Sequence, residues 1–216
     1  MDRQELEAKL RAFVGRQTGP PAIGPYPVNE AMIGHWCEAM GDRLPVYTDR
    51  AAAEKSVHGG IVAPPTMLQA WSMRGFAMAQ QMEDATEEQL AVHRLLTAAG
   101  YPSVVATNCE QGYTRYLRPG DQVVGTTVIE SISEQKATAL GVGYFIDTRT
   151  IYRDQHGEEL GWMTFRVLKF KPNPPAAAAA PAEASGAAAQ PRRLRPPLGH
   201  DNQWWWEGIA AGELRI

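Results

Sequence analysis

The stretch that decides the fold runs from Gly41 to Trp71 and reads GDRLPVYTDRAAAEKSVHGGIVAPPTMLQAW. It begins with a polar turn, continues into a short helical piece around residues 49–55, and crosses a glycine loop before two prolines. Pro65 suits the first position of a helix, because its missing N–H would have no partner there in any case. The residues from Thr66 onward leave almost no polar face, which is typical of a buried helix.

The turn at the start of this stretch carries a family resemblance. Residues 41–47 read GDRLPVY and resemble the G-D-x-N-P-aliphatic-H turn of MaoC-type hot-dog dehydratases and R-specific enoyl-CoA hydratases. The Gly, Asp, Pro and aliphatic positions match, whereas Leu44 takes the Asn position and Tyr47 takes the His position. The resemblance extends over about residues 5–172, and YLRPGD at residues 116–121 is its other specific part.

The resemblance implies a hot-dog fold, in which a long curved antiparallel sheet wraps around one central helix. The residue pattern by itself indicates only an α+β chain. Gly75 falls inside the pattern of the buried helix and weakens it. We therefore expect the central helix to be shortened or broken, with residues 81–100 as an insertion beside it.

The remaining elements follow from local patterns. Asn29 is a suitable N-cap and Gly41 a suitable stop for a helix between them. Strand-rich segments from Ser103 to Lys171, separated by turns, predict an antiparallel meander rather than βαβ units. The other predictions are a helix over 2–14, at most a short edge strand within 15–27, a second helix over 87–100, and strand turns at 118–121, about 138–141, and 155–157.

Composition places the chain among ordinary soluble globular proteins, since 44% of its 216 residues are hydrophobic and 21% are charged. A net charge of −3 argues against a nucleic-acid-binding surface. Cys37 and Cys109 lie far apart and outside any C-x-x-C pair, which predicts reduced thiols in a cytoplasmic protein. The sequence contains no apolar run of membrane-spanning length and no metal-ligand spacing, so we expect neither a membrane partner nor a metal.

The C-terminal part differs in composition from the rest. We predict a hot-dog domain over residues 1–172, an Ala/Pro linker over 173–198, and a further segment over 199–216 that contains Trp204, Trp205 and Trp206. This last segment resembles the opening helix of the acyl-CoA-associated DUF35 domains. The resemblance implies a protein that continues beyond residue 216, and a possible contact with a thiolase-like lyase through this segment.

Hydration of an α,β-unsaturated thioester needs a base, an acid and donors to the thioester oxygen. In the family that the chain resembles, the Asp and His of the turn hold the catalytic water. Tyr47 is a poor substitute for that His, because a phenol with a pKa of about 10 is a weak base at pH 7. Asp42 is then either a surviving catalytic carboxylate or an ordinary turn aspartate. His58 is either a replacement base or a solvated loop residue.

Two groups of residues are candidates for substrate contacts. The resemblance implies that an N–H near the start of the central helix faces the thioester oxygen, while a plain helix start is the alternative reading of the same residues. These candidate acyl-pocket residues are Gly60, Ala63, Pro64, Pro65 and Thr66. Basic residues that either meet the phosphates of coenzyme A or are simply solvated are Arg115, Arg118, Lys169 and Lys171. We expect no cofactor apart from the coenzyme A of the substrate.

These observations predict one subunit of a heteromeric 2-enoyl-CoA hydratase. A partner hot-dog chain would carry the catalytic Asp and His, and this chain would shape a pocket for a bulky acyl group such as a steroid side chain. A scaffold that links a hydratase to a downstream enzyme is the alternative from a different class. A hot-dog thioesterase is disfavoured, because residues 66–80 contain no Asp or Glu where that class needs an acid.

Overall fold

The computed structural model describes residues 2–73, 75, 88–173, 207 and 211. The chain divides into two compact units, Met1–Pro174 and Pro175–Ile216, and the architecture described below is that of the first. Apart from Asn173, Glu207 and Ala211, the predicted linker and the tryptophan-containing segment lie outside the described residues. The predicted domain boundaries therefore stay a prediction.

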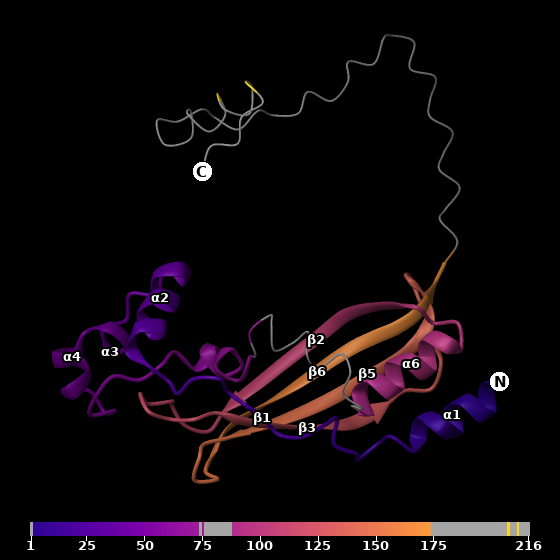
Figure 1. The fold of residues 1–216 in the computed structure, drawn as a ribbon, viewed down its shortest axis with the longest axis horizontal. Coiled ribbons are helices and arrows are strands. Elements are labelled where there is room, and N and C mark those ends of the chain that lie inside the picture. Colours follow the sequence, from indigo (N-terminus) through magenta and orange to yellow (C-terminus); the bar gives the residue numbers. More distant parts are fainter. Residues whose placement is uncertain (1, 74, 76–87, 174–206, 208–210, 212–216) are drawn as a thin grey trace. The chain divides into compact units, whose positions relative to one another are not determined.

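An antiparallel sheet forms the body of the first unit (Figure 1). Its strand order is β1-β3-β5-β6-β2, and β4 pairs with the start of β5. The predicted meander is confirmed for β3, β5 and β6, but β2 pairs with β6 at the far edge instead of with β3. The strands are β1 (Ala22–Ile23), β2 (Ser103–Tyr113), β3 (Val124–Ile132), β4 (Lys136–Thr138), β5 (Gly141–Arg153) and β6 (Glu159–Pro172).

Helices cover the two ends of the sheet (Figure 1). At one end lie α2 (Glu30–Met40), α3 (Pro45–Thr48) and α4 (Arg50–Glu54), and at the other lie α1 (Arg3–Arg11) and α6 (Glu88–Ala98). The predicted limits of α2 are confirmed: the Asn29 side chain accepts a hydrogen bond from the Met32 N–H at 2.9 Å, and Gly41 ends the helix with φ of 67°.

The buried helix expected from Thr66 is absent from the described residues. Two short 3-10 turns stand in its place, η1 (Pro65–Met67) and η2 (Ala70–Ser72), and the backbone is extended again at Met73. Apolar periodicity cannot separate a buried helix from buried turns, because both hide the same side chains. Met67, Leu68 and Trp71 are buried as expected; residues 74 and 76–87 lie outside the described part.

The described core consists of two clusters on the inner face of the sheet. One gathers α2, α3, α4 and the 3-10 turns over Tyr152 and Leu160, and the other packs α1 and α6 over Ile129, Tyr144 and Ile146. Between them the inner face carries threonines whose hydroxyls bond to each other or to the backbone, namely Thr127, Thr148 and Thr150. Among the described residues, the long sheet therefore carries two clusters of buried side chains.

Candidate functional site

The turn after α2 is built around Asp42. Its Oδ1 accepts a hydrogen bond from the Leu44 N–H at 3.0 Å, the geometry by which a turn aspartate fixes its own backbone. Its own N–H donates to the Cys37 carbonyl at 2.8 Å, which completes the end of α2. Leu44 itself is largely exposed. The bonds observed for Asp42 are thus those of a turn residue.

Tyr47 occupies the position of the expected base and is buried, with 7% of its surface exposed. Tyr116 and Asp42 are neighbours of its hydroxyl. Burial first, and then the neighbouring Tyr116 and Asp42, raise the pKa of the Tyr47 phenol above its ordinary value. Tyr47 therefore stays neutral at pH 7 and cannot act as a general base.

His58 also reaches this cluster. Its ring lies 4.4 Å from the ring of Tyr116, centroid to centroid, at an interplanar angle of 53°. Its backbone N–H donates to the Ser56 hydroxyl at 3.1 Å. The sequence placed His58 in the correct region, but it gave no sign that Tyr116 would stand between His58 and Tyr47. These contacts bring Asp42, Tyr47, Tyr116 and His58 together without a direct Asp–His pair.

The loop with the predicted acyl-pocket residues lies against the segment after β2 that carries Tyr116. The Ala63 N–H donates to the Leu117 carbonyl at 2.9 Å, so it is not free to face a thioester oxygen. Ala63 and Pro64 are buried, Gly60 and Pro65 are half-buried, and Thr66 is exposed. The Thr66 N–H has no acceptor among the described residues. Of the predicted set, Gly60 and Thr66 are the residues whose backbone N–H groups have no acceptor among the described residues.

Arg115 does not point to a coenzyme A phosphate. Its guanidinium is held by three carboxylates, those of Asp121 at 2.7 Å, Asp154 at 3.0 Å and Glu158 at 3.0 Å. It also donates to the Tyr116 carbonyl at 3.0 Å, and thereby holds the segment after β2 that carries Tyr116. The ion pairs within the fold do not favour the suggestion that Arg115 binds phosphate, which stays a prediction.

The other basic candidates differ in exposure. Lys169 is 6% exposed and its Nζ donates to the Pro102 carbonyl at 2.8 Å, so it is neither solvated nor at a surface where phosphates could reach. Arg118 and Lys171 are exposed. Burial of Lys169 could not be read from the sequence, because it depends on α6 and the turn at Pro102 that cover the end of β6.

The inner face of the edge strand β2 is open. Residues that are directly paired in an antiparallel sheet share a face, so Cys109, opposite Phe165, points to the same side as the buried Thr148. Cys109 is nevertheless exposed, and Val104 and Tyr113 on the same face are 54% and 43% exposed. We call the inner-face residues of β2 the β2 trough: Val104, Ala106, Cys109, Gln111 and Tyr113.

Comparison with known proteins assigns the family. Residues 12–161 match the family model described as FAS1-like, dehydratase domain region. The chain belongs to this FAS1-like dehydratase family. The family has the MaoC-like hot-dog fold, which confirms the fold predicted from residues 41–47 and 116–121.

Two relatives of this chain are named as hydratase alpha subunits. This chain is 42% identical to a probable enoyl-CoA hydratase alpha subunit of Thermomonospora curvata. It is 40% identical to the 3-oxo-4,17-pregnadiene-20-carboxyl-CoA hydratase alpha subunit of Mycobacterium tuberculosis. Both matches cover 100% of this chain, which spans 66% and 65% of the two relatives' lengths. The crystal structure of the ChsH1-ChsH2 complex from Mycobacterium tuberculosis matches with a TM-score of 0.69 and 42% identity, over 80% of this chain and 93% of that chain.

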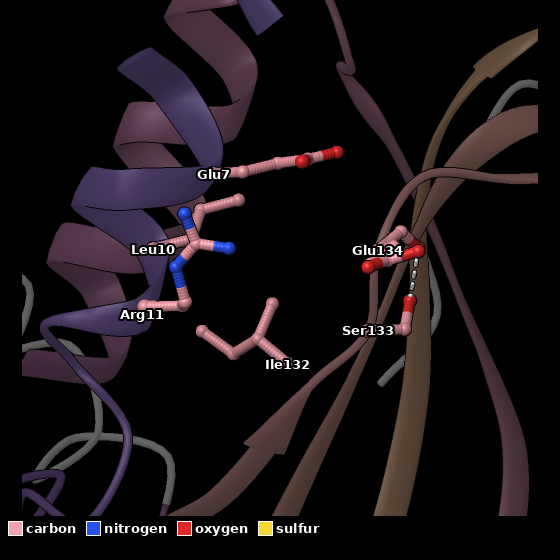
Figure 2. A pocket seen from close by; sticks show the side chains of 6 residues that line it. All are labelled: Glu7, Leu10, Arg11, Ile132, Ser133 and Glu134. Atoms are coloured by element: carbon pink, nitrogen blue, oxygen red, sulfur yellow. Dashed lines mark hydrogen bonds between the residues drawn. The ribbon is translucent and has the colours of Figure 1, made fainter. Parts of the chain in front are cut away.

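Two hollows of the dehydratase domain lie away from the Tyr47 cluster. Figure 2 shows one of about 190 Å³ between α1 and the end of β3, with Glu7 and Arg11 facing Ser133 and Glu134. The other, of about 340 Å³, lies on the outer face of the sheet beside the Asp147–Arg166 ion pair. Neither contains the predicted site residues. Within the described residues no His/Cys/Asp/Glu group is arranged to hold a metal ion, and no helix has the length and apolarity to cross a membrane.

Proposed function

We propose that this chain is one subunit of a heteromeric 2-enoyl-CoA hydratase that adds water across the double bond of a bulky acyl thioester. The partner chain supplies the catalytic Asp and His, and this chain supplies part of the acyl pocket. Coenzyme A enters only as part of the substrate. The proposal rests on three features of the chain, which concern the catalytic pair, the partner and the acyl group.

The observation that carries the proposal is the neutral, buried Tyr47 at the position of the base. Within the described cluster the histidine present is His58, and its recorded ring contact is with Tyr116 and not with Asp42. The Asp42 carboxylate accepts the Leu44 N–H within its own turn. A member of a dehydratase family whose described cluster lacks the Asp–His pair supports the proposal that another subunit carries the catalytic residues.

A partner chain has a suitable place to pair. β2 is eleven residues long and bonds to β6 on one side, and its other edge has no strand partner among the described residues. A second hot-dog chain that adds a strand there would extend the sheet and close over the β2 trough. The names of the relatives support this arrangement, because an alpha subunit and a two-protein complex both imply a second chain.

The acyl group is proposed to be bulky because the inner face of β2 carries exposed apolar side chains. Among the described residues two short 3-10 turns precede this strand, and Val104 and Tyr113 of the β2 trough are exposed. Pockets for large apolar ligands need such uncovered apolar surface. The polycyclic substrate in the name of the Mycobacterium tuberculosis relative is consistent with an acyl group of this size.

Cys109→Trp tests whether this chain lines the pocket. An indole in the β2 trough should lower kcat/KM of the mixed complex for a polycyclic enoyl-CoA by about 10- to 100-fold, since forcing extra volume into a filled site costs about 1–3 kcal/mol. Hydration of crotonyl-CoA should stay within about threefold, because a short acyl group does not reach the trough.

The matched control is Asn108→Trp, which places the same indole one residue away on the outer face of β2. It should leave both substrates unaffected, with complex formation of each variant checked by size-exclusion chromatography. If Cys109→Trp changes neither substrate, the chain does not line the pocket, and the scaffold hypothesis replaces the proposed function.

A further inference from the structure

The β2 trough holds two neighbouring polar residues that the hydration chemistry does not use. Gln111 is paired with Met163 of β6, and Met163 is paired with the buried Thr150 of β5. Residues paired directly across strands share a face, so Gln111 lies on the inner face, and Tyr113 follows on the same face two residues further along β2. The Tyr113 hydroxyl donates a hydrogen bond to Gln111 Oε1 at 2.8 Å.

The carboxamide nitrogen of Gln111 has only weak acceptors. Gln111 Nε2 lies 3.5 Å from Met163 Sδ and 3.9 Å from Cys109 Sγ. Both acceptors recorded for this nitrogen among the described residues are therefore sulfur atoms, and thioether and thiol sulfurs accept hydrogen bonds weakly. The Gln111 amide keeps a donor capacity that an oxygen atom would satisfy better.

Tyr113 adds an acceptor beside this donor. Its hydroxyl hydrogen goes to Gln111 Oε1, so the lone pairs of its own oxygen remain, and no described residue is recorded as a donor to them. Burial first, and then Cys109, raise the pKa of the Tyr113 phenol, so the hydroxyl keeps its hydrogen at pH 7. The same bond holds the Gln111 carboxamide with its nitrogen on the side of the two sulfur atoms.

This pair of side chains is accessible in the described part of the chain. Tyr113 is 43% exposed, Cys109 is exposed, and Gln111 is half-buried. The three residues belong to the surface that the proposed function assigns to the acyl group. A polar group on the acyl portion would therefore meet an N–H donor and an oxygen acceptor two residues apart on one strand face.

We propose that Gln111 and Tyr113 bind a hydroxyl group on the acyl portion of the substrate, with Gln111 Nε2 donating to the hydroxyl oxygen and Tyr113 Oη accepting the hydroxyl hydrogen. This inference rests on the proposed function, and it names the substrate class as hydroxylated bulky enoyl-CoA thioesters. A hydroxyl satisfies both members of the pair, whereas a ketone oxygen can only accept and a hydrocarbon can do neither. Gln111 and Tyr113 are then specificity-determining residues outside the reacting double bond.

The test assays the mixed complex with a series of polycyclic enoyl-CoA thioesters. Each member carries one hydroxyl on a different ring, and the deoxy parent and the matching ketones complete the series. One hydroxylated isomer should exceed the parent by about 10- to 30-fold in kcat/KM, mainly through KM, as expected for two neutral hydrogen bonds. Its ketone counterpart should exceed the parent by only about 3- to 5-fold. A series without a preferred hydroxyl isomer, or a ketone that equals or surpasses it, overturns the inference.

Two trough variants locate the preference. Gln111→Met keeps the length of the side chain but removes the amide donor, and it should reduce the hydroxyl preference to about threefold or less. Tyr113→Phe should also lower the preference, because it removes the acceptor and releases the Gln111 carboxamide. Hydration of the deoxy parent should change by less than about twofold in both variants, since the parent makes neither bond.

Glu110→Met is the matched control, because it makes a similar change one residue away, on the outer face of β2 opposite Thr164. It should keep the hydroxyl preference. A preference that survives both trough variants, or an equal loss for the hydroxylated and parent substrates, contradicts the inference. If Gln111→Met does not fold, Tyr113→Phe decides.

Calorimetric binding of the preferred hydroxylated thioester and its deoxy parent separates this inference from the proposed function. A complex that hydrates both thioesters but binds them equally refutes the hydroxyl site and leaves the hydratase assignment standing. A complex that hydrates neither but binds the hydroxylated thioester more tightly refutes the hydratase assignment and keeps the hydroxyl site. Equal binding without hydration refutes both.

Discussion

Mixing this chain with a MaoC-type hot-dog chain that carries an intact Asp/His turn should raise the rate of polycyclic enoyl-CoA hydration by about 10³-fold or more over this chain alone. General acid–base catalysis contributes about 10²- to 10⁴-fold, and the described Tyr47 cluster contains no direct Asp–His pair that could supply it. At pH 7 a phenol with a pKa of 10 or above is ionised to at most about one part in a thousand, and the pKa of Tyr47 is raised.

The rate is followed by the loss of absorbance of the conjugated enoyl thioester. The partner chain alone is the necessary control, and it should hydrate the polycyclic substrate poorly because it lacks the β2 trough. Full activity of this chain by itself would show that a base is assembled within it. His58 would then be the residue to replace first, since it is the histidine that contacts the Tyr47 cluster through Tyr116.

Replacing Arg115 by Met should lower the free energy of unfolding by about 3 kcal/mol, because it removes the shared cation from carboxylates that the fold partly buries. Asp121 and Asp154 are 13% and 4% exposed in their side chains, so water cannot replace the guanidinium there. The measurement is chemical denaturation of the chain at pH 7, and Arg118→Met, in the same turn but exposed, should change the stability by less than about 0.5 kcal/mol.

The loss of stability caused by Arg115→Met should become smaller as the pH falls. Burial alone would raise the pKa of Asp154, but the backbone N–H groups of Glu158 and His156 and the Arg115 guanidinium outweigh it and hold that pKa below its usual value. A carboxyl with a lowered pKa stabilises the fold above the pKa of the unfolded chain, about 3.9, and loses this contribution as the pH falls further. The difference between wild type and Arg115→Met should therefore be full at pH 7 and shrink below about pH 4. Equal destabilisation by Arg115→Met and Arg118→Met would contradict the role of the network.

The parts of the fold that depend on local chemistry could be predicted from the sequence. Asn29 and Gly41 act within one turn of the chain, so their capping roles follow from residue type. The strands after Ser103 and the turns between them also follow from local patterns. The family resemblance added the hot-dog arrangement, which the matched family and the solved complex confirm.

The parts that depend on distant contacts could not be predicted. β2 looks like any other strand, and nothing in its own residues selects β6 over β3 as its neighbour. Arg115 and Lys169 look like ordinary strand-end basic residues, yet three carboxylates enclose one and the α6 side of the sheet buries the other. Burial and ion pairing are decided by elements far along the chain, so a basic residue in a sequence carries little information about its role.

The most direct test of a catalytic pair on the partner is to replace the residues of the 41–47 turn in this chain, and separately those of the matching turn in the partner, and to assay each mixed complex. Asp42→Asn with Tyr47→Phe keeps the size of both side chains, and it should leave kcat/KM for a polycyclic enoyl-CoA within about threefold. The Asp→Asn and His→Ala changes in the partner's turn should each lower it by about 10²-fold or more. Loss of activity from the Asp42 and Tyr47 changes, with the partner's changes tolerated, would contradict the account and place the chemistry in this chain.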